Sequence, residues 1–286
     1  MRFLPLAKTL LLAALLVSSS LAVRAQNIPI APNIPSQPEN PNIKLPSYDV
    51  ASIRASNTSS RMMRLRNAPD GFSCENINLK SLIANAYGIR QDLITGGPSW
   101  INSTGFDVEA KVAGPDIATF NKLSDRQRAS LLQALLTDRF HLKLHHEIRN
   151  LPMYDLVIAK GGSKLKPAAP FTPPPDLPMN PGAMRRPGML RMGPGMIQGD
   201  ALPIAAIANQ LSYAVSSTVV DKTGLAGNYD FDLKWQPVNS GPAANADDSG
   251  VSIFTAVQEQ LGLKLQPTKG PVDTLVIDQA EKPSEN

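Results

Sequence analysis

The chain has 286 residues, of which 42% are hydrophobic and 18% charged, so it is long enough to bury a sizeable core. Its formal net charge is +4, but residues 1–25 hold three of the 28 basic residues and none of the 24 acidic ones, which leaves 25 − 24 = +1 for the remainder. This balance, with no stripe of basic and aromatic side chains, argues against nucleic acid as a partner.

The N-terminal segment is typical of an export signal. Residues 1–25 combine a basic start, an apolar run and a small-x-small cleavage pattern before Gln26. The run is too short to span a membrane, and no other stretch of 18 apolar residues follows. We therefore expect a periplasmic or secreted protein with no stable membrane insertion after signal removal. Residues 26–46 are proline-rich and predict an extended spacer.

Periodicity predicts the elements that follow. In chain order they are a strand at 48–53, a helix at 79–87, strands at 93–95 and 106–112, and a helix at 126–140. Gly88 ends the first helix, because glycine tolerates the left-handed cap, and Ser124 is the expected N-cap of the second. Residues 161–187 contain eight prolines and predict a linker.

The remainder repeats this plan. We expect a helix at 203–215, strands around 219–220 and 229–235, a polar loop at 239–250, a helix at 251–261 and two closing strands. Residues 131–158 and 252–277 match most closely, since each has helical spacing, a Leu-Lys-Leu strand core, a turn and a returning strand. Upstream, Ile83-Ala84-Asn85 recurs 124 residues later, and Phe106-Asp107-Val108 recurs 125 residues later as Phe231-Asp232-Leu233.

The predicted fold class is therefore α+β. Two tandem similar lobes, at 47–160 and 188–286, each place two helices on a small, mainly antiparallel sheet. A duplicated scaffold of this kind is stabilised by its core, because the single Cys74 excludes an intramolecular disulfide. We expect Cys74 to be a small buried or half-buried side chain in a strand rather than a reactive thiol.

The only histidines are His141, His145 and His146. On a strand, His141 and His145 would share one face, and a carboxylate from elsewhere could complete a zinc site. No HExxH or CxxC pattern accompanies them, so we expect exposed strand histidines, with His141 and His145 as weak candidate ligands and no metal or cofactor.

Three other patterns have a chemical and a structural interpretation. Asp221-Lys222-Thr223-Gly224 copies most of the phosphorylated aspartate motif of P-type ion pumps, yet we favour a turn between strands. Methionines at 179, 184, 189, 192 and 196 could bind copper(I), although linker and hairpin are the favoured interpretation. Asp230 and Asp232 could serve acid-base chemistry or simply face water, which we favour.

No catalytic residue is identified, because the chain has no GxSxG or Walker pattern and no triad can be placed. The candidate ligand-binding residues lie on expected turns and strand starts: Trp100, Asp221, Lys222 and Tyr229. Trp100, which follows Gly97-Pro98, has core packing as its alternative.

Several motifs resemble an uncharacterised family, a secreted domain of unknown function that is abundant in acidobacteria of the Solibacter type. They are Tyr48-Asp49-Val50-Ala51-Ser52-Ile53, Gly96-Gly97-Pro98-Ser99-Trp100, Phe106-Asp107-Val108-Glu109-Ala110, Asp138-Arg139-Phe140-His141-Leu142, Val220 to Gly224, Tyr229-Asp230-Phe231 and Lys282-Pro283-Ser284-Glu285-Asn286. The resemblance covers about residues 47 to 286. It implies secretion but no activity; related domains that follow antibiotic-sensor-type membrane metallopeptidases imply extracytoplasmic sensing.

Each predicted lobe also resembles, in pattern only, the short N-terminal domain of secretins and TonB-dependent receptors, which is an interaction module. The favoured hypothesis is a non-enzymatic binding or sensing module that engages an envelope protein or a cell-surface ligand. The alternative is an envelope hydrolase or carbohydrate-active enzyme whose site is not visible in the sequence. A purely structural envelope component is the third hypothesis.

Overall fold

The computed structural model describes residues 45–57, 63–169, 188–237 and 251–284. The predicted signal, nearly all of the spacer, most of the linker with Met179 and Met184, and the predicted loop at 239–250 lie outside the described residues. The described part is α+β, as expected, and its strands form three four-stranded sheets.

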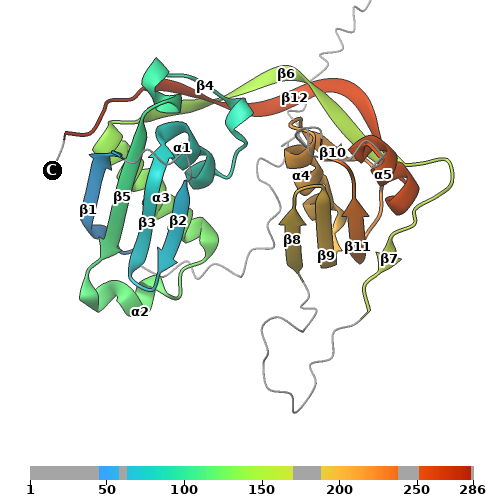
Figure 1. Ribbon diagram of the computed structural model, residues 1–286, viewed down its shortest axis with the longest axis horizontal. Helices are drawn as coiled ribbons and strands as arrows, with labels where there is room; N and C mark the ends of the chain where they lie inside the picture. The colour runs from blue at the N-terminus through green and yellow to red at the C-terminus, as the bar shows by residue number, and fades with distance from the viewer. Residues whose placement is uncertain (1–44, 58–62, 170–187, 238–250, 285–286) are drawn as a thin grey trace, which may run out of the picture. The chain divides into compact units, whose positions relative to one another are not determined.

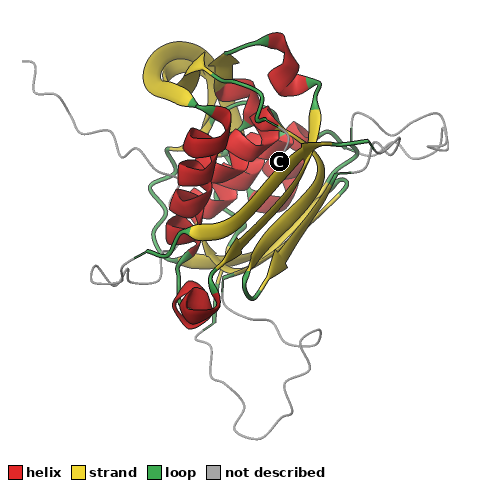
Figure 2. Cartoon of the chain, turned by 90° about the vertical axis from the view of Figure 1, so that its left-hand side faces the viewer, coloured by secondary structure: helices red, strands yellow, loops and turns green. Residues whose placement is uncertain are grey.

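The first sheet has the order β1-β5-β3-β2, with antiparallel neighbours (Figure 1). Its strands are β1 Tyr48–Ala55, β5 Gly105–Val112, β3 Gly71–Asn78 and β2 Arg64–Ala68. Apolar side chains alternate along β5 and face helices α1 (Leu79–Tyr87) and α3 (Asp125–Phe140), which lie along one face of the sheet (Figure 2). A short helix, α2 (Ile117–Phe120), precedes α3.

The helix ends follow the predicted caps. Gly88 has a φ of 61° and ends α1 in the left-handed conformation. At the start of α3, the Ser124 hydroxyl accepts from the Gln127 N–H (3.2 Å), and the Gln127 side chain accepts from the Ser124 N–H (2.9 Å). This reciprocal arrangement is a capping box, which satisfies two otherwise unpaired donors.

Replacing Ser124 with alanine is expected to lower the free energy of unfolding by about 1 kcal/mol, because it removes the cap of α3. Urea denaturation followed by circular dichroism measures this loss. Ser130→Ala is the matched control, since the Ser130 hydroxyl only donates back to the Arg126 carbonyl within α3. Equal losses in both variants would show that the cap does not stabilise the fold.

The second sheet has the order β7-β11-β9-β8, which repeats the order of the first with corresponding elements (Figure 1). Its strands are β7 Lys166–Pro167, β11 Asn228–Lys234, β9 Met196–Pro203 and β8 Met189–Gly193. Helices α4 (Ile204–Ala214) and α5 (Ile253–Leu261) pack with it and correspond to α1 and α3. Strand β7 lies in the range predicted as linker.

A matching bulge in both sheets fixes how the repeats correspond. The Asp107 carboxylate accepts from the N–H of Asn76 (2.9 Å), and the Asp230 carboxylate accepts from the N–H of Ala201 (2.8 Å). Asn76 and Ala201 both have a positive φ, 52° and 51°. Asp107 therefore corresponds to Asp230 in the structure. The sequence comparison paired Asp107 with Asp232, which lies two residues further along the chain. A shift of two residues keeps the same strand face, so alternation alone did not reveal it.

The predicted hairpin at the end of each copy is wrong. Each copy instead has one long strand, β6 Lys143–Ile158 and β12 Leu263–Gln279, and the two strands pair with each other in antiparallel register. The pairing is nearly symmetric, with Leu144 opposite Ile277 and Ile158 opposite Leu263. The middle of β6 is mostly exposed. Its sequence therefore does not alternate between apolar and polar residues, and it could not be distinguished from a turn.

Two short strands complete the third sheet, whose order is β10-β6-β12-β4. Strand β4 (Ile94–Gly96) runs parallel to the end of β12, and β10 (Val219–Asp221) runs parallel to the end of β6. As a result, Leu275 and Ile277 of β12 belong to the core formed by the first sheet and its helices, which we call the first cluster. Leu156 of β6 belongs to the second cluster. Each repeat thus contributes a strand end to the other's core.

Candidate functional site

A hollow of about 380 Å³ lies at the C-terminal end of α3. We call it the terminal hollow, and its lining residues are Ala51, Ile53, Asp138, Arg139, His141, Glu281, Lys282, Pro283 and Ser284. They come from β1, from the end of α3 and from the segment after β12. Three of the motifs that carry the family resemblance therefore meet at one place, although up to 233 residues separate them in the sequence, from Ala51 to Ser284.

A left-handed residue ends α3 and positions this hollow. His141 has a φ of 45° and caps the helix, so the chain leaves α3 there and β6 begins at Lys143. The Phe140 carbonyl accepts a hydrogen bond from the Glu281 N–H (2.7 Å), which docks the C-terminal segment against the end of the helix. The expectation that His141 shares a strand face with His145 is therefore wrong, because His141 precedes the strand.

Trp100 lies beside the same segment. Its ring stacks on Phe140, with ring centroids 6.4 Å apart, and meets the ring of Phe106 edge to face at 6.0 Å. The Lys282 ammonium lies 5.8 Å from the centroid of the Trp100 ring, within the range of a cation–π interaction. Trp100 thus packs on the first cluster and also supports one of the charged side chains of the hollow.

The charged groups of the terminal hollow keep unused hydrogen-bonding capacity. Arg139 Nε lies 3.1 Å from Asp138 Oδ2, and Glu281 Oε1 accepts from the Gln279 amide (2.8 Å). His141 Nε2 and Glu281 Oε2 are 4.0 Å apart. Within the described residues, neither the Arg139 Nη atoms nor the Lys282 ammonium donates a hydrogen bond, and Asp138 accepts none. The hollow therefore presents both free donors and free acceptors.

The other candidate residues lie elsewhere. The Asp221 carboxylate accepts from the N–H and the hydroxyl of Thr223 (2.9 and 2.7 Å), which forms the predicted turn. The Lys222 N–H donates to the Leu156 carbonyl, and the Tyr229 hydroxyl donates to Ala226 (both 2.9 Å). Tyr229 is 8% exposed and belongs to the second cluster, whereas Trp100 packs on the first, so the four residues do not form one site.

The two strand histidines pair with aspartates of the neighbouring strand. His145 Nδ1 lies 2.9 Å from Asp278 Oδ2, and His146 Nδ1 lies 2.9 Å from Asp273 Oδ2. Among the described residues, no group of three His, Cys, Asp or Glu side chains could hold a metal ion. No Ser, Thr or Cys side chain in that part of the chain bonds to a histidine either.

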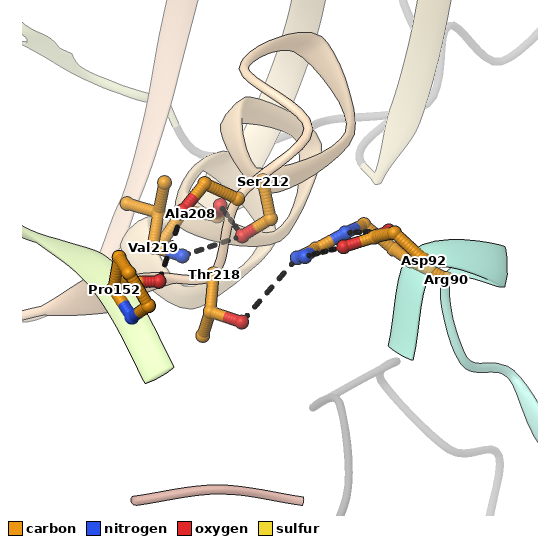
Figure 3. A network of polar contacts seen from close by, with 8 residues as sticks. Arg90, Asp92, Pro152, Ala208, Ser212, Thr218 and Val219 are labelled. Carbon is orange, nitrogen blue, oxygen red and sulfur yellow. Dashed lines mark hydrogen bonds and ion pairs between the residues drawn. The ribbon is translucent and has the colours of Figure 1, made fainter. Parts of the chain in front are cut away.

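A buried arginine forms a further polar cluster (Figure 3). Arg90 Nε and Nη2 donate to the Asp92 carboxylate at 2.9 and 2.7 Å, and Nη1 lies 3.5 Å from the Thr218 hydroxyl. Nearby, the Ser212 hydroxyl donates to the Ala208 carbonyl and accepts from the Val219 N–H, both at 2.9 Å. These groups satisfy one another, which indicates a structural role.

The single thiol is buried in β3, as predicted. Burial raises the pKa of Cys74 from 9.0 to about 12, and burial likewise raises the pKa of Tyr48 from 10.0 to about 12. A thiol with so high a pKa carries little thiolate at neutral pH and is a poor nucleophile.

The raised thiol pKa predicts a loss of stability in alkali. Below pH 9 the thiol is protonated in both states; above it the unfolded chain releases the proton first, so the free energy of unfolding falls by about 1.4 kcal/mol per pH unit until about pH 12. Urea denaturation at pH 8 and pH 10 measures the decrease. Cys74→Ala is the control and should lose less stability over the same interval, because only buried tyrosines such as Tyr48 and Tyr87, whose pKa values are also raised, still contribute. Parallel curves for both proteins would contradict the thiol's role.

Comparison with known proteins assigns the chain to a family. Residues 80–280 match the family described as "Protein of unknown function (DUF3738)". The chain belongs to this family. No curated protein and no solved structure matches it. In the described part of this DUF3738 protein, no helix is long and apolar enough to cross a membrane.

The charged residues of the terminal hollow that the sequence did not single out are Asp138, Arg139, Glu281 and Lys282. Their signal was present, because three of them belong to two of the motifs by which the chain resembles its family. The sequence does not indicate that these residues lie close together, because no local pattern predicts that the C-terminal segment docks on the end of α3.

Proposed function

We propose that this DUF3738 protein is a secreted or periplasmic binding module that takes its ligand in the terminal hollow. One observation carries the proposal: three distant segments converge there and present charged side chains with unused donors and acceptors. Such convergent polar groups in a concave surface are the usual mark of a ligand site. Export rests on the signal-like composition of residues 1–25.

Binding is favoured over hydrolysis by the chemistry at hand. Within the described residues, the hollow has no serine or cysteine hydrogen-bonded to a base, and the thiol of the chain is buried in β3. The pattern resemblance to the short interaction domain of secretins and TonB-dependent receptors supports the same class. An envelope protein or a cell-surface molecule is therefore the proposed partner.

Capture from envelope extract tests this function. Residues 26–286 serve as bait, and bound species are identified by mass spectrometry. The hollow variant Arg139→Gln/Lys282→Gln is compared with the control variant Lys222→Gln/Lys264→Gln, which removes the same charge from exposed positions outside the hollow.

The expected result is a species captured by the wild type and the control but lost from the hollow variant. Equal capture by all three proteins would place the contact surface elsewhere. Loss in the control variant alone would favour the turn at Lys222. Turnover in a broad hydrolase screen, with no captured species, would replace binding by the enzymatic alternative.

A further inference from the structure

Resting on the proposed function, we infer that the ligand of the terminal hollow is a zwitterion of the amino-acid or short-peptide class, with a free carboxylate and a free ammonium group. The inference comes from the signs and the unused atoms of the charged side chains. Of the two kinds of partner that the proposed function leaves open, it selects a small cell-surface molecule over an envelope protein.

The fixed charges of the hollow cancel. Arg139 and Lys282 contribute two positive charges, and Asp138 and Glu281 contribute two negative charges. A ligand of one sign would pair with only half of these charges and would lie beside the two like charges of the other half. A ligand that carries both signs can pair with both sets, and electrostatic complementarity of this kind selects among ligands.

The cationic side suits a carboxylate. The Arg139 Nη atoms form a planar fork whose geometry matches the two oxygens of a carboxylate, and they donate no hydrogen bond within the described residues. The Lys282 ammonium has Trp100 as its recorded contact, at 5.8 Å, and donates no hydrogen bond there. Both groups can therefore turn toward an incoming anion without breaking a hydrogen bond to another described residue.

The anionic side suits an ammonium group. Asp138 uses one oxygen in its contact with Arg139, and Glu281 Oε2 has a distant neighbour in His141 at 4.0 Å. These acceptors surround the C-terminal end of α3, where the helix dipole adds partial negative charge. A positive group is favoured at such an end, whereas an isolated anion is not.

The size of the hollow fits the same class. Its volume of about 380 Å³ lies near the lower end of the range for small-molecule pockets, roughly 300–1,000 Å³. The apolar part of its lining is formed by Ala51, Ile53 and Pro283, which could contact a small aliphatic side chain. A dipeptide with small side chains meets these conditions.

Titration of residues 26–286, labelled with ¹⁵N, tests the inference by chemical-shift changes. The probe is L-alanyl-L-alanine with both termini free, compared with its N-acetylated and its C-amidated forms. We expect saturable shifts at 138–141 and 281–284 with a Kd of about 1 mM, and a Kd at least roughly tenfold higher when either terminus is blocked.

Two variants assign each terminus to its partner. Arg139→Gln/Lys282→Gln should bind the free and the amidated dipeptide equally weakly, and Asp138→Asn/Glu281→Gln should no longer distinguish the free from the acetylated form. Equal binding of blocked and free probes by the wild type would overturn the inference, and so would no saturation up to roughly 20 mM. If envelope capture still depends on the hollow in that case, the proposed function stands and only the ligand class is wrong.

Discussion

Phe140→Ala is expected to lower the free energy of unfolding by about 3–5 kcal/mol. The ring of Phe140 is fully buried at the end of α3, between Phe106, whose centroid is 5.3 Å away, and Trp100 at 6.4 Å. Removal of the ring leaves a cavity in the first cluster, and no polar interaction compensates for the lost packing. Urea denaturation followed by circular dichroism measures the loss.

A matched substitution separates burial from residue type. Phe254 on α5 is 42% exposed and contacts the ring of Tyr154 at 5.4 Å, so Phe254→Ala is expected to lose only about 1 kcal/mol. Similar losses for Phe140→Ala and Phe254→Ala would contradict the packing described for the end of α3. Since Phe140 also anchors the C-terminal segment, its variant should weaken the terminal hollow as well.

Cleavage of the chain within residues 170–187 is expected to leave the two fragments associated. Each cluster contains a strand end from the other fragment, because β6 supplies Leu156 to the second cluster and β12 supplies Leu275 and Ile277 to the first. The two long strands also pair along their full length. Separation would break this ladder and expose both cores to water, so dissociation is expected to require unfolding of the fragments.

A protease site inserted in that range of the intact chain allows the test. After cleavage, the protein should elute as one particle in size-exclusion chromatography and unfold in a single urea transition. The uncleaved chain with the same insertion is the control. Two separate particles, each with its own cooperative transition, would contradict the pairing of β6 with β12.

Local signals explain what the sequence predicted well. The helices α1 and α3 were found with their caps, because Gly88 and Ser124 act within a few residues of the helix they bound. The turn after Asp221 was found for the same reason. A comparison of the chain with itself indicated a repeat, and two of the sheets have the same strand order.

Non-local pairing explains what the sequence did not predict. The partner of β6 was expected within its own repeat, but β6 pairs along its whole length with β12, more than 100 residues away. The terminal hollow depends on the same kind of contact. Arg139 and Lys282 belong to separate motifs of the family resemblance, and the docking of Glu281 on Phe140 brings them together. Periodicity carries no information about such contacts.

Site-specific photo-crosslinking is the direct test of whether the ligand binds at the terminal hollow. A photoreactive residue replaces His141, whose side chain is 63% exposed at the hollow, or Lys222 on the distant turn. After irradiation in envelope extract, we expect a crosslinked species at position 141 and none at position 222. Crosslinking at position 222 alone would contradict binding at the hollow and move the binding surface to the turn after β10.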